Sequence, residues 1–430
     1  MNYQQTLKEV FGFDSLRGGQ QHVIEKVLDG HSSAAIFPTG SGKSLCYQLP
    51  ALLLPNLTLV ISPLLALMKD QITFLKSKGI AAASIDSTQT REETQAILQG
   101  VRNGEIKILM ISVERLKNER FRQFIAQINI SLLVVDEAHC ISEWGHNFRP
   151  DYLKLPQDCE ELNIPQVLLL TATATPAVIE DMGKKFNITK ENVVITGFYR
   201  PNLDISIIPV EEEQKRSALF ATLKQKPDQA SIVYVTLQQT AENVAQWLQS
   251  NGIQAKAYHA GLKHDIRESI QHQFMNGDIN CIVATIAFGM GVDKSDIRQV
   301  IHFDLPKSIE NYSQEIGRAG RDGKLSFCTV LANTSGLNVL ENFVYGDTPD
   351  REAIQYVLDD IYKSSETWET QLLRLSKDSN VRQLPLKTLL VYLELKHIIQ
   401  AKYSYYADYR FKTLISINDI IAKFQTERQQ

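Results

Sequence analysis

Residues 34–44 read Ala34-Ala35-Ile36-Phe37-Pro38-Thr39-Gly40-Ser41-Gly42-Lys43-Ser44, and residues 132–139 read Leu132-Leu133-Val134-Val135-Asp136-Glu137-Ala138-His139. In both stretches an apolar run ends in residues that bind phosphate or metal. A glycine-rich turn after a strand presents backbone N–H groups to phosphate, with Lys43 near the β- and γ-phosphates and Ser44 on Mg²⁺. Asp136 adds a metal ligand, and Glu137 polarises the attacking water. Together the stretches predict hydrolysis of a nucleoside triphosphate with Mg²⁺.

The glycine-rich turn departs from the strict pattern G-x-x-x-x-G-K-[ST], because Phe37 stands in place of the first glycine. The alternative interpretation is a glycine turn that binds no nucleotide. The strand before the turn and the acidic stretch after it favour the nucleotide site. The predicted ATP-binding residues of the turn are Thr39, Gly40, Ser41, Gly42, Lys43 and Ser44.

Apolar runs alternate with helical stretches along most of the chain. The first half has runs at 34–37, 57–62, 106–111, 131–135 and 167–170, with helices expected at 65–78 and 91–102. After a pause at 198–203 the runs resume at 231–235, 255–258, 281–285, 300–303 and 328–331. Near-continuous apolar strands that alternate with helices are typical of parallel sheets covered on both faces. We therefore expect two α/β domains, at 1–200 and 201–345.

The rhythm changes after residue 346. Residues 349–362, 367–375 and 385–396 are expected to form helices, and 398–414 alternate and are rich in tyrosine, as in a β-hairpin. Helices followed by a hairpin resemble a winged-helix module, so residues 346–430 are expected to form a small α+β domain.

Composition excludes several classes of protein. The 430 residues carry a net charge of −4 and are 43% hydrophobic, which is ordinary for a globular protein. The sequence lacks a transmembrane-length apolar window and a secretory signal, so no membrane association is expected. Five cysteines without a C-x-x-C pair argue against disulfides and zinc and suit the cytoplasm.

Residues 314–323 read Gln314-Glu315-Ile316-Gly317-Arg318-Ala319-Gly320-Arg321-Asp322-Gly323. Arg318 and Arg321 are three residues apart, a spacing that puts both on one face of a helical turn. Arginines that a second domain presents to the γ-phosphate accelerate phosphoryl transfer, so Arg318 and Arg321 are predicted catalytic residues. Gln314 is assigned to the same catalytic site. The alternative is an ordinary surface pair of arginines.

At this point residues 7–335 resemble the RecQ family of superfamily 2 DNA helicases. The motifs that carry the resemblance lie at 11–13 with 16–20, 62–64 with 68–71, 87–89, 136–150, 171–174, 258–262, 284–285 and 288–294. The resemblance implies two RecA-like domains, ATP and Mg²⁺, and 3′ to 5′ movement on single-stranded and forked duplex DNA in repair, recombination or replication. We expect a monomer, although the sequence does not specify the oligomeric state, and a place at the nucleoid if the protein is bacterial.

The resemblance also implies roles for individual residues. Arg17 and Gln20 lie on the adenine side of the nucleotide. The residues expected to bind DNA or couple it to hydrolysis are His139, Trp144, His146, Phe148, Arg149, Thr171, Thr173, His259 and Thr285. Aromatic side chains stack on bases of any sequence, which independently supports Trp144 and Phe148. Protein partners are not specified.

The chain departs from the family pattern in three places. Family members commonly carry a four-cysteine zinc subdomain after the second motor domain, but Cys328 is the last cysteine here. Val235-Thr236-Leu237 replaces an Asn-Ser-Arg-like motif, and Val113 replaces a proline. In the expected hairpin a tyrosine either separates strands as a pin or packs within the hairpin; the candidates are Tyr403, Tyr405, Tyr406 and Tyr409.

Two rival functions remain open from the sequence. An RNA helicase is one, because the Asp-Glu-Ala-His string also occurs in RNA motors; the aromatic continuation after His139 favours DNA. A DNA-binding translocase or sensor that uses ATP as a switch, without unwinding, is the other.

Overall fold

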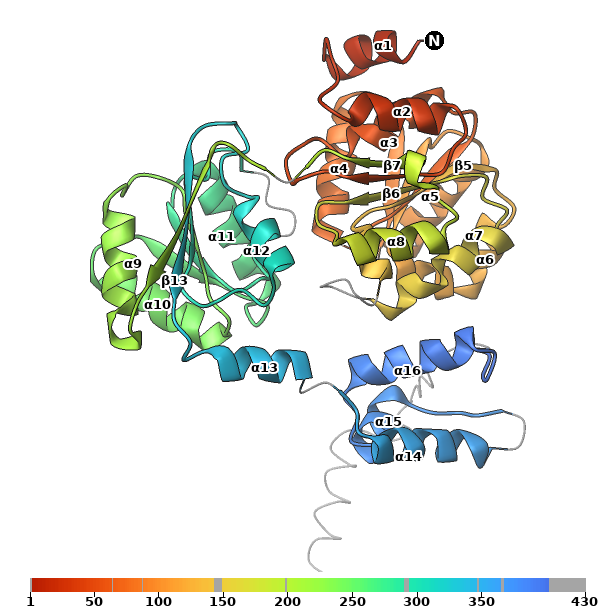
Figure 1. Ribbon diagram of the computed structural model, residues 1–430. Coiled ribbons are helices and arrows are strands. Elements are labelled where there is room, and N and C mark those ends of the chain that lie inside the picture. Colours follow the sequence, from red (N-terminus) through yellow and green to blue (C-terminus); the bar gives the residue numbers. More distant parts are fainter. Residues whose placement is uncertain are drawn as a thin grey trace, which may run out of the picture.

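The computed structural model describes residues 2–63, 65–86, 88–142, 149–197, 199–289, 294–345, 348–364 and 367–401. Within these ranges two sheets follow each other along the chain, and a small group of helices follows the second sheet (Figure 1).

The first sheet has the strand order β3-β4-β2-β5-β6-β1-β7 within the described ranges, and its strand pairs are parallel. Its strands are β1 (Ser33–Ile36), β2 (Leu57–Ile61), β3 (Ala82–Ile85), β4 (Ile108–Ile111), β5 (Ile130–Val135), β6 (Val167–Thr171) and β7 (Val193–Ile195). Its longer helices are α2 (Gln20–Leu28), α3 (Leu45–Leu53), α4 (Leu65–Ser77), α5 (Arg91–Arg102), α6 (Glu119–Ile125), α7 (Leu155–Glu161) and α8 (Pro176–Lys185). The short turns are α1 (Tyr3–Thr6), η1 (Leu7–Phe11), η2 (Val113–Lys117), η3 (Ala138–Ile141), η4 (Pro150–Lys154) and η5 (Lys190–Asn192).

Burial on both faces explains why the strands are apolar at nearly every position. In β2, Leu57, Leu59 and Ile61 face one core, which α5–α8 cover. Val60 faces the other core, under α2–α4. Successive strand residues point to opposite faces, so a sheet between two helical layers needs an apolar residue at each position.

The second sheet has the order β10-β11-β9-β12-β13-β8 in the described part of the chain, again with parallel pairs. Its strands are β8 (Leu203–Pro209), β9 (Ser231–Tyr234), β10 (Ala255–Tyr258), β11 (Cys281–Ala284), β12 (Gln299–His302) and β13 (Ser326–Ala332). Helices α9 (Lys215–Lys224) and α10 (Gln238–Ser250), with the turn η6 (Glu212–Gln214), belong to one side. Helices α11 (His264–Asn276) and α12 (Ile309–Ile316) cover the other side, which faces the first domain in Figure 1.

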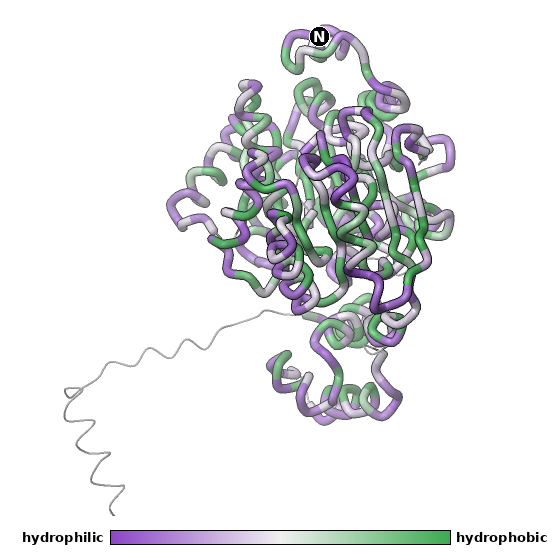
Figure 2. The backbone as a smooth tube through the Cα atoms, turned by 90° about the vertical axis from the view of Figure 1, so that its left-hand side faces the viewer, coloured by the Kyte–Doolittle hydropathy of each residue, from purple (hydrophilic) through white to green (hydrophobic). Residues whose placement is uncertain are grey.

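Four helices complete the described chain: α13 (Leu337–Tyr345), α14 (Arg351–Tyr362), α15 (Leu372–Asp378) and α16 (Gln383–Leu395). The last three share a small apolar core that includes Val357, Leu375 and Leu386. Figures 1 and 2 show them as a separate small body below the sheets. In the described ranges, every helix is too short or too polar to cross a membrane.

The expected fold class is confirmed for the two parallel-sheet α/β domains. Three strands, β3, β7 and β8, were not expected; β8 falls partly in the pause between the two sets of apolar runs. It is an edge strand whose Ile205 and Ile207 are exposed, so it lacks the continuous burial that marks the other strands. Helix α15 begins at Leu372, later than the expected residue 367. Residues 398–401 form no strand, and the rest of the expected hairpin, with its tyrosines, lies outside the described residues, so the winged-helix assignment stays a prediction.

Candidate functional site

Neighbouring strand ends bring the predicted phosphate and metal residues together. Strands β5, β6 and β1 lie side by side in the first sheet, and ligands of such sheets bind at the carboxyl ends of the strands. The turn after β1 carries residues 38–44, and the turn after β5 carries Asp136 and Glu137. Gly40 and Gly42 have φ angles of 81° and 80°, which glycine adopts without steric strain. The glycine-rich turn therefore has the backbone conformation that its sequence predicts.

Lys43 and Ser44 are held by protein groups in this structure. The Lys43 Nζ donates to the Phe37 carbonyl oxygen at 3.0 Å. Burial lowers the pKa of Lys43, although the nearby carboxylates of Glu137 and Asp136 act to raise it. The Ser44 Oγ accepts from Gln71 Nε2 at 2.9 Å. The sequence motif at 68–71 includes Gln71, but nothing in the sequence indicated that it holds the Ser44 hydroxyl.

The adjacent carboxyl groups Asp136 and Glu137 lie directly after β5. The Asp136 N–H donates to Ile61 O at 2.8 Å, and the Glu137 N–H donates to Asp136 Oδ1 at 3.0 Å. Burial, followed by the charge of Glu137, raises the pKa of Asp136 to about 7. Two neighbouring carboxyl groups in a partly buried position favour a nearby cation. This environment fits Mg²⁺ bound with a nucleotide. The described residues contain no cluster of three His, Cys, Asp or Glu side chains suited to a metal ion.

His139 links the ends of β5 and β6. Its Nδ1 lies 3.3 Å from Glu137 Oε2 and 2.9 Å from Thr171 Oγ1. The Thr171 hydroxyl donates to Thr173 O at 3.0 Å, so His139 Nδ1–H is the donor to Thr171 Oγ1. Burial acts to lower the pKa of His139, but hydrogen bonds with Cys140 and Glu137 outweigh it and raise the pKa to about 10. The structure thus joins three predicted coupling residues, His139, Thr171 and Thr173, to Glu137.

Arg17 and Gln20 contact the backbone of the glycine-rich turn. Gln20 Nε2 donates to Ser41 O at 3.1 Å and to Gly42 O at 2.9 Å, and Gln20 Oε1 accepts from the Arg17 N–H at 2.8 Å. Arg17 Nη1 donates to Gly40 O at 3.2 Å. Both ends of the buried Gln20 amide are therefore engaged with protein groups here.

The two predicted catalytic arginines go to different places. Helix α12, which carries Gln314, ends at Ile316, so Arg318 and Arg321 lie in the turn that follows and not on a shared helix face. The buried Arg318 donates to Gly289 O inside the second domain. Arg321 instead lies against the glycine-rich turn: a Cβ built on Gly40 would be 3.2 Å from Arg321 Cγ. The positive charge of Arg321 also acts to lower the pKa of Lys43. Arg321 is thus the arginine that faces the phosphate-binding turn.

The remaining predicted DNA-coupling residues are only partly described. Trp144, His146 and Phe148 lie outside the described residues. Arg149 Nη1 is 4.0 Å from Glu114 Oε1, at the exposed surface. In the second domain, His259 and Thr285 follow the neighbouring strands β10 and β11 and are buried. His259 Nε2 lies 3.2 Å from Glu242 Oε1, and the Thr285 N–H donates to Tyr258 O at 3.2 Å.

The residues that depart from the family pattern, 235–237 and Val113, lie in the described part of the chain. Val235 is buried, the Thr236 N–H donates to Asp304 Oδ2 at 2.9 Å, and Leu237 is exposed. Val113 is buried at the start of η2.

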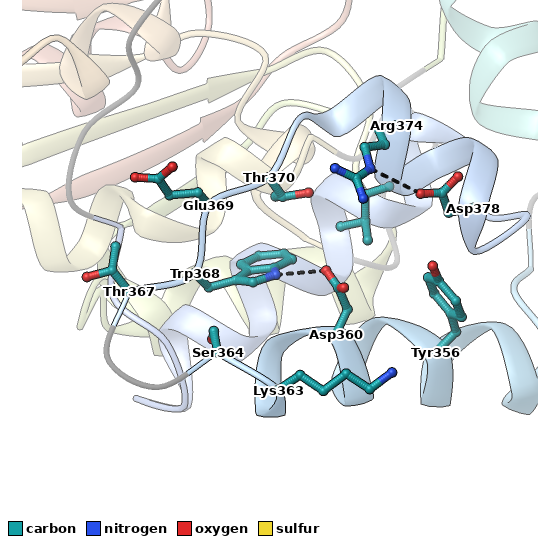
Figure 3. A pocket seen from close by; sticks show the side chains of 11 residues that line it. Tyr356, Asp360, Lys363, Ser364, Thr367, Trp368, Glu369, Thr370, Arg374 and Asp378 are labelled. Atoms are coloured by element: carbon teal, nitrogen blue, oxygen red, sulfur yellow. Dashed lines mark hydrogen bonds and ion pairs between the residues drawn. The ribbon is translucent and has the colours of Figure 1, made fainter.

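A polar cavity of about 330 Å³ lies away from this site, among the C-terminal helices (Figure 3). Trp368 Nε1 donates to Asp360 Oδ2 at 2.9 Å on its wall, and Arg374 Nε donates to Asp378 Oδ2 at 3.4 Å. The first bond ties the segment after α14 to that helix, whereas the second lies within α15.

Two family models match the chain in order. Residues 17–182 match the DEAD/DEAH box helicase model, and residues 214–323 match the helicase conserved C-terminal domain.

Curated relatives extend the similarity. The chain is 43% identical over 338 residues to "ATP-dependent DNA helicase RecQ" of Bacillus subtilis, covering 78% of this chain and 57% of that protein. It is 40% identical over 371 residues to "Probable ATP-dependent DNA helicase RecS" of the same organism, covering 86% and 74%. It is 37% identical over 408 residues to "ATP-dependent DNA helicase Q-like 5" of Arabidopsis thaliana, covering 92% and 45%. The chain spans about half the length of most of the curated relatives named for RecQ or Q-like helicases that it matches.

Solved structures share the arrangement of the two domains. S. cerevisiae Dbp5 bound to RNA and ADP BeF3 aligns with a TM-score of 0.61 at 16% identity, over 84% of this chain and 98% of that one. Mycobacterium smegmatis Lhr bound to ssDNA and AMP-PNP aligns with a TM-score of 0.62 at 18% identity, over 92% and 57%. At these identities the likeness establishes the fold alone.

Proposed function

This chain belongs to the RecQ family of superfamily 2 helicases, and from that premise we propose that it is an ATP-dependent DNA helicase. It moves 3′ to 5′ on single-stranded DNA and unwinds forked duplexes. The observation that carries the proposal is the meeting of Arg321 from the second domain with the glycine-rich turn of the first, beside the partly buried pair Asp136 and Glu137. A hydrolytic site shared by two domains makes ATP turnover depend on their closure.

Each residue of the site has a part in hydrolysis under this proposal. The N–H groups of residues 39–44 and the Lys43 ammonium bind the phosphates. Ser44 and Asp136 would hold Mg²⁺, which would supply positive charge to the phosphate oxygens. Glu137 orients the attacking water and accepts its proton, and Arg321 stabilises the charge that develops on the γ-phosphate. Arg318 bonds to Gly289 O and so holds the turn that carries Arg321 in place. Gln314, on α12, is proposed as a further catalytic residue.

The proposal assigns the coupling of DNA to hydrolysis to the chain of hydrogen bonds from Glu137 through His139 to Thr171 and Thr173. In the sequence, residues 143–148 follow His139 and Glu137 by a few positions and precede Arg149, so DNA bound by this aromatic-rich stretch would be a few residues from the water-orienting group. In the second domain, His259 and Thr285 follow the carboxyl ends of β10 and β11, and we assign them to the same coupling of DNA to hydrolysis. Opening one base pair costs about 1.4 kcal/mol of stacking, which thermal fluctuation reaches and a ratcheting motor captures.

The proposal divides the chain at residues 200 and 345, with a winged-helix module at 346–430 whose tyrosines meet the duplex. It also places the protein in the cytoplasm, at the nucleoid in a bacterium, as a monomer. The Tyr-rich segment is the natural candidate for strand separation because aromatic rings stack on a terminal base pair.

Strand separation on matched duplexes with a 3′ or a 5′ single-stranded tail tests the proposal. We expect ATP-dependent unwinding from the 3′ tail only, lost in Glu137→Gln, which keeps the side-chain shape but cannot accept the water's proton. DNA-stimulated hydrolysis without unwinding of either substrate would leave an ATP-gated translocase or sensor. Stronger stimulation and unwinding with RNA would identify an RNA helicase.

A further inference from the structure

The connector between the two sheets carries an arginine that touches the turn before Arg321. Arg200 Nη2 donates to Ala319 O at 3.0 Å and to Gly320 O at 2.8 Å. Ala319 and Gly320 are the two residues between Arg318 and Arg321. Nη2 carries two N–H donors, so this one amino group bonds to two successive carbonyl groups, and the rest of the planar guanidinium is left to bond to other acceptors.

Asn202 holds the same turn from the connector. The Leu203 N–H donates to Arg200 O at 3.1 Å, which closes a turn with Pro201 at its second position. This turn lets Arg200 Nε donate to Asn202 Oδ1 at 3.3 Å, while Asn202 Nδ2 donates to Gly320 O at 2.9 Å and Lys324 O at 3.0 Å. A Cβ on Gly320 would come within 2.5 Å of Asn202 Nδ2, so the two turns fit only with glycine there.

Arg200 also reaches the first domain. Its Nη1 donates to Thr39 O, at the edge of the glycine-rich turn, over 3.5 Å. Nearby, a Cβ on Gly317 would lie 3.1 Å from Thr39 Cβ. When the two domains separate, the bond to Thr39 must break, whereas the bonds to Ala319 and Gly320 need not. Arg200 therefore moves with the turn that carries Arg321 and meets the phosphate-binding turn on closure.

We propose that Arg200 is a positioning residue for ATP hydrolysis: it fixes the 319–320 backbone so that closure delivers Arg321 to the γ-phosphate. The inference rests on the proposed ATPase function and extends it to a residue whose bonds here go to protein groups of the site, mostly backbone carbonyls. Its effect is therefore on turnover and not on nucleotide affinity, because a displacement of about 1 Å at a reacting centre can cost about 100-fold in rate.

A double-mutant cycle in the 430-residue chain tests this, with steady-state ATP hydrolysis at saturating single-stranded DNA and separate binding of a fluorescent ATP analogue. We expect Arg200→Ala to lower kcat about 10- to 100-fold with analogue affinity nearly unchanged. We expect Arg321→Ala to lower kcat by about 1,000-fold or more, and Arg200→Ala to add little in that background. Arg200→Lys keeps the charge without the fork, so it also stays slow; it serves in place of Arg200→Ala if that variant does not fold.

An unchanged kcat in Arg200→Ala overturns the inference and leaves the proposed function standing. Equal losses from Arg200→Ala with and without Arg321 also overturn it, because Arg200 would then act independently of that arginine. A wild-type chain that does not hydrolyse ATP contradicts the proposed function and the inference together.

Discussion

At the scale of single residues, the surroundings of His139 act on its pKa in opposite directions. Its ring is buried and lies between the Glu137 carboxylate and the Thr171 hydroxyl. Burial alone would favour the neutral ring, yet the partners hold the pKa at about 10. A protonated His139 therefore compensates the charge of the adjacent Glu137 carboxylate.

This protonation predicts a pH-dependent contribution to stability. The folded pKa lies above the unfolded value of about 6.5, so the native state binds more protons between these values. The stabilisation from His139 is complete below about pH 6.5 and is lost as the pH rises toward 10. We expect the melting temperature of His139→Ala to fall furthest below wild type near pH 6, with the gap narrowing by about pH 9. Circular dichroism melts of both proteins without nucleotide measure this; a gap that is constant with pH would contradict it.

At the scale of elements, helix α16 connects the C-terminal body to the first domain. It contacts η4, the turn that follows the aromatic-rich segment, and Lys154 of η4 forms an ion pair with Glu394 of α16. Val391 is buried but lies outside the core shared by α14–α16. Since Val391 and Glu394 are three residues apart, they lie on the same side of the helix, a second side distinct from the one that packs on α14.

We expect Glu394→Ala to loosen this contact. Both side chains are less than one-third exposed, so loss of a charge-assisted bond costs about 1.5–3 kcal/mol of docking free energy. Hydrogen exchange over Gln383–Leu395 should accelerate and should return toward wild type in the swapped pair Lys154→Glu with Glu394→Lys. Arg374→Ala is the matched control, because it removes an exposed pair within α15 and should leave α16 unchanged. Equal exchange in wild type and Glu394→Ala would show that the ion pair does not hold the helix.

At the scale of the whole molecule, the two domains meet at places where a glycine on one side faces a side chain on the other. Gly40 meets Arg321, and Gly317 meets Thr39. Gly317 has an ordinary φ of −60°, so glycine is not needed there for its backbone conformation. It is needed because the absence of a side chain lets Thr39 approach closely.

A nucleotide that bridges the domains should raise the melting temperature, because a ligand that binds only the folded state stabilises it by mass action. At a ligand concentration of 100 times Kd this adds about 2.7 kcal/mol to the free energy of unfolding. We expect Gly317→Ala to reduce this increase, because its methyl group meets Thr39 across the interface. Gly336→Ala, also in the second half of the chain but with open space around the new methyl group, should respond as wild type does. Melting curves with increasing AMP-PNP and Mg²⁺ measure the difference; equal increases in all three proteins would mean that the bound state does not use this contact.

Features that depend on neighbouring residues could be predicted from the sequence. The near-continuous apolar runs of β2 and β5 predicted doubly covered parallel strands, because each residue faces a core on one side or the other. Helix α5 was expected at its observed bounds; Thr90 and Glu93 cap its start by bonding to each other's backbone N–H. The glycines, Lys43 and the Asp136–Glu137 pair mark a phosphate and metal site by residue type alone. Their catalytic roles stay predictions.

The partners of those residues emerged only from the tertiary structure. Nothing in the local sequence separates Arg318, which turns inward to Gly289, from Arg321, which faces Gly40. Arg200 contacts backbone more than a hundred positions away, and Glu394 pairs with Lys154 from another domain. Strand β8 was missed because its isoleucines are exposed at a sheet edge. Local patterns record burial and backbone preference, whereas contacts between distant segments exist only once two independently formed surfaces pack together.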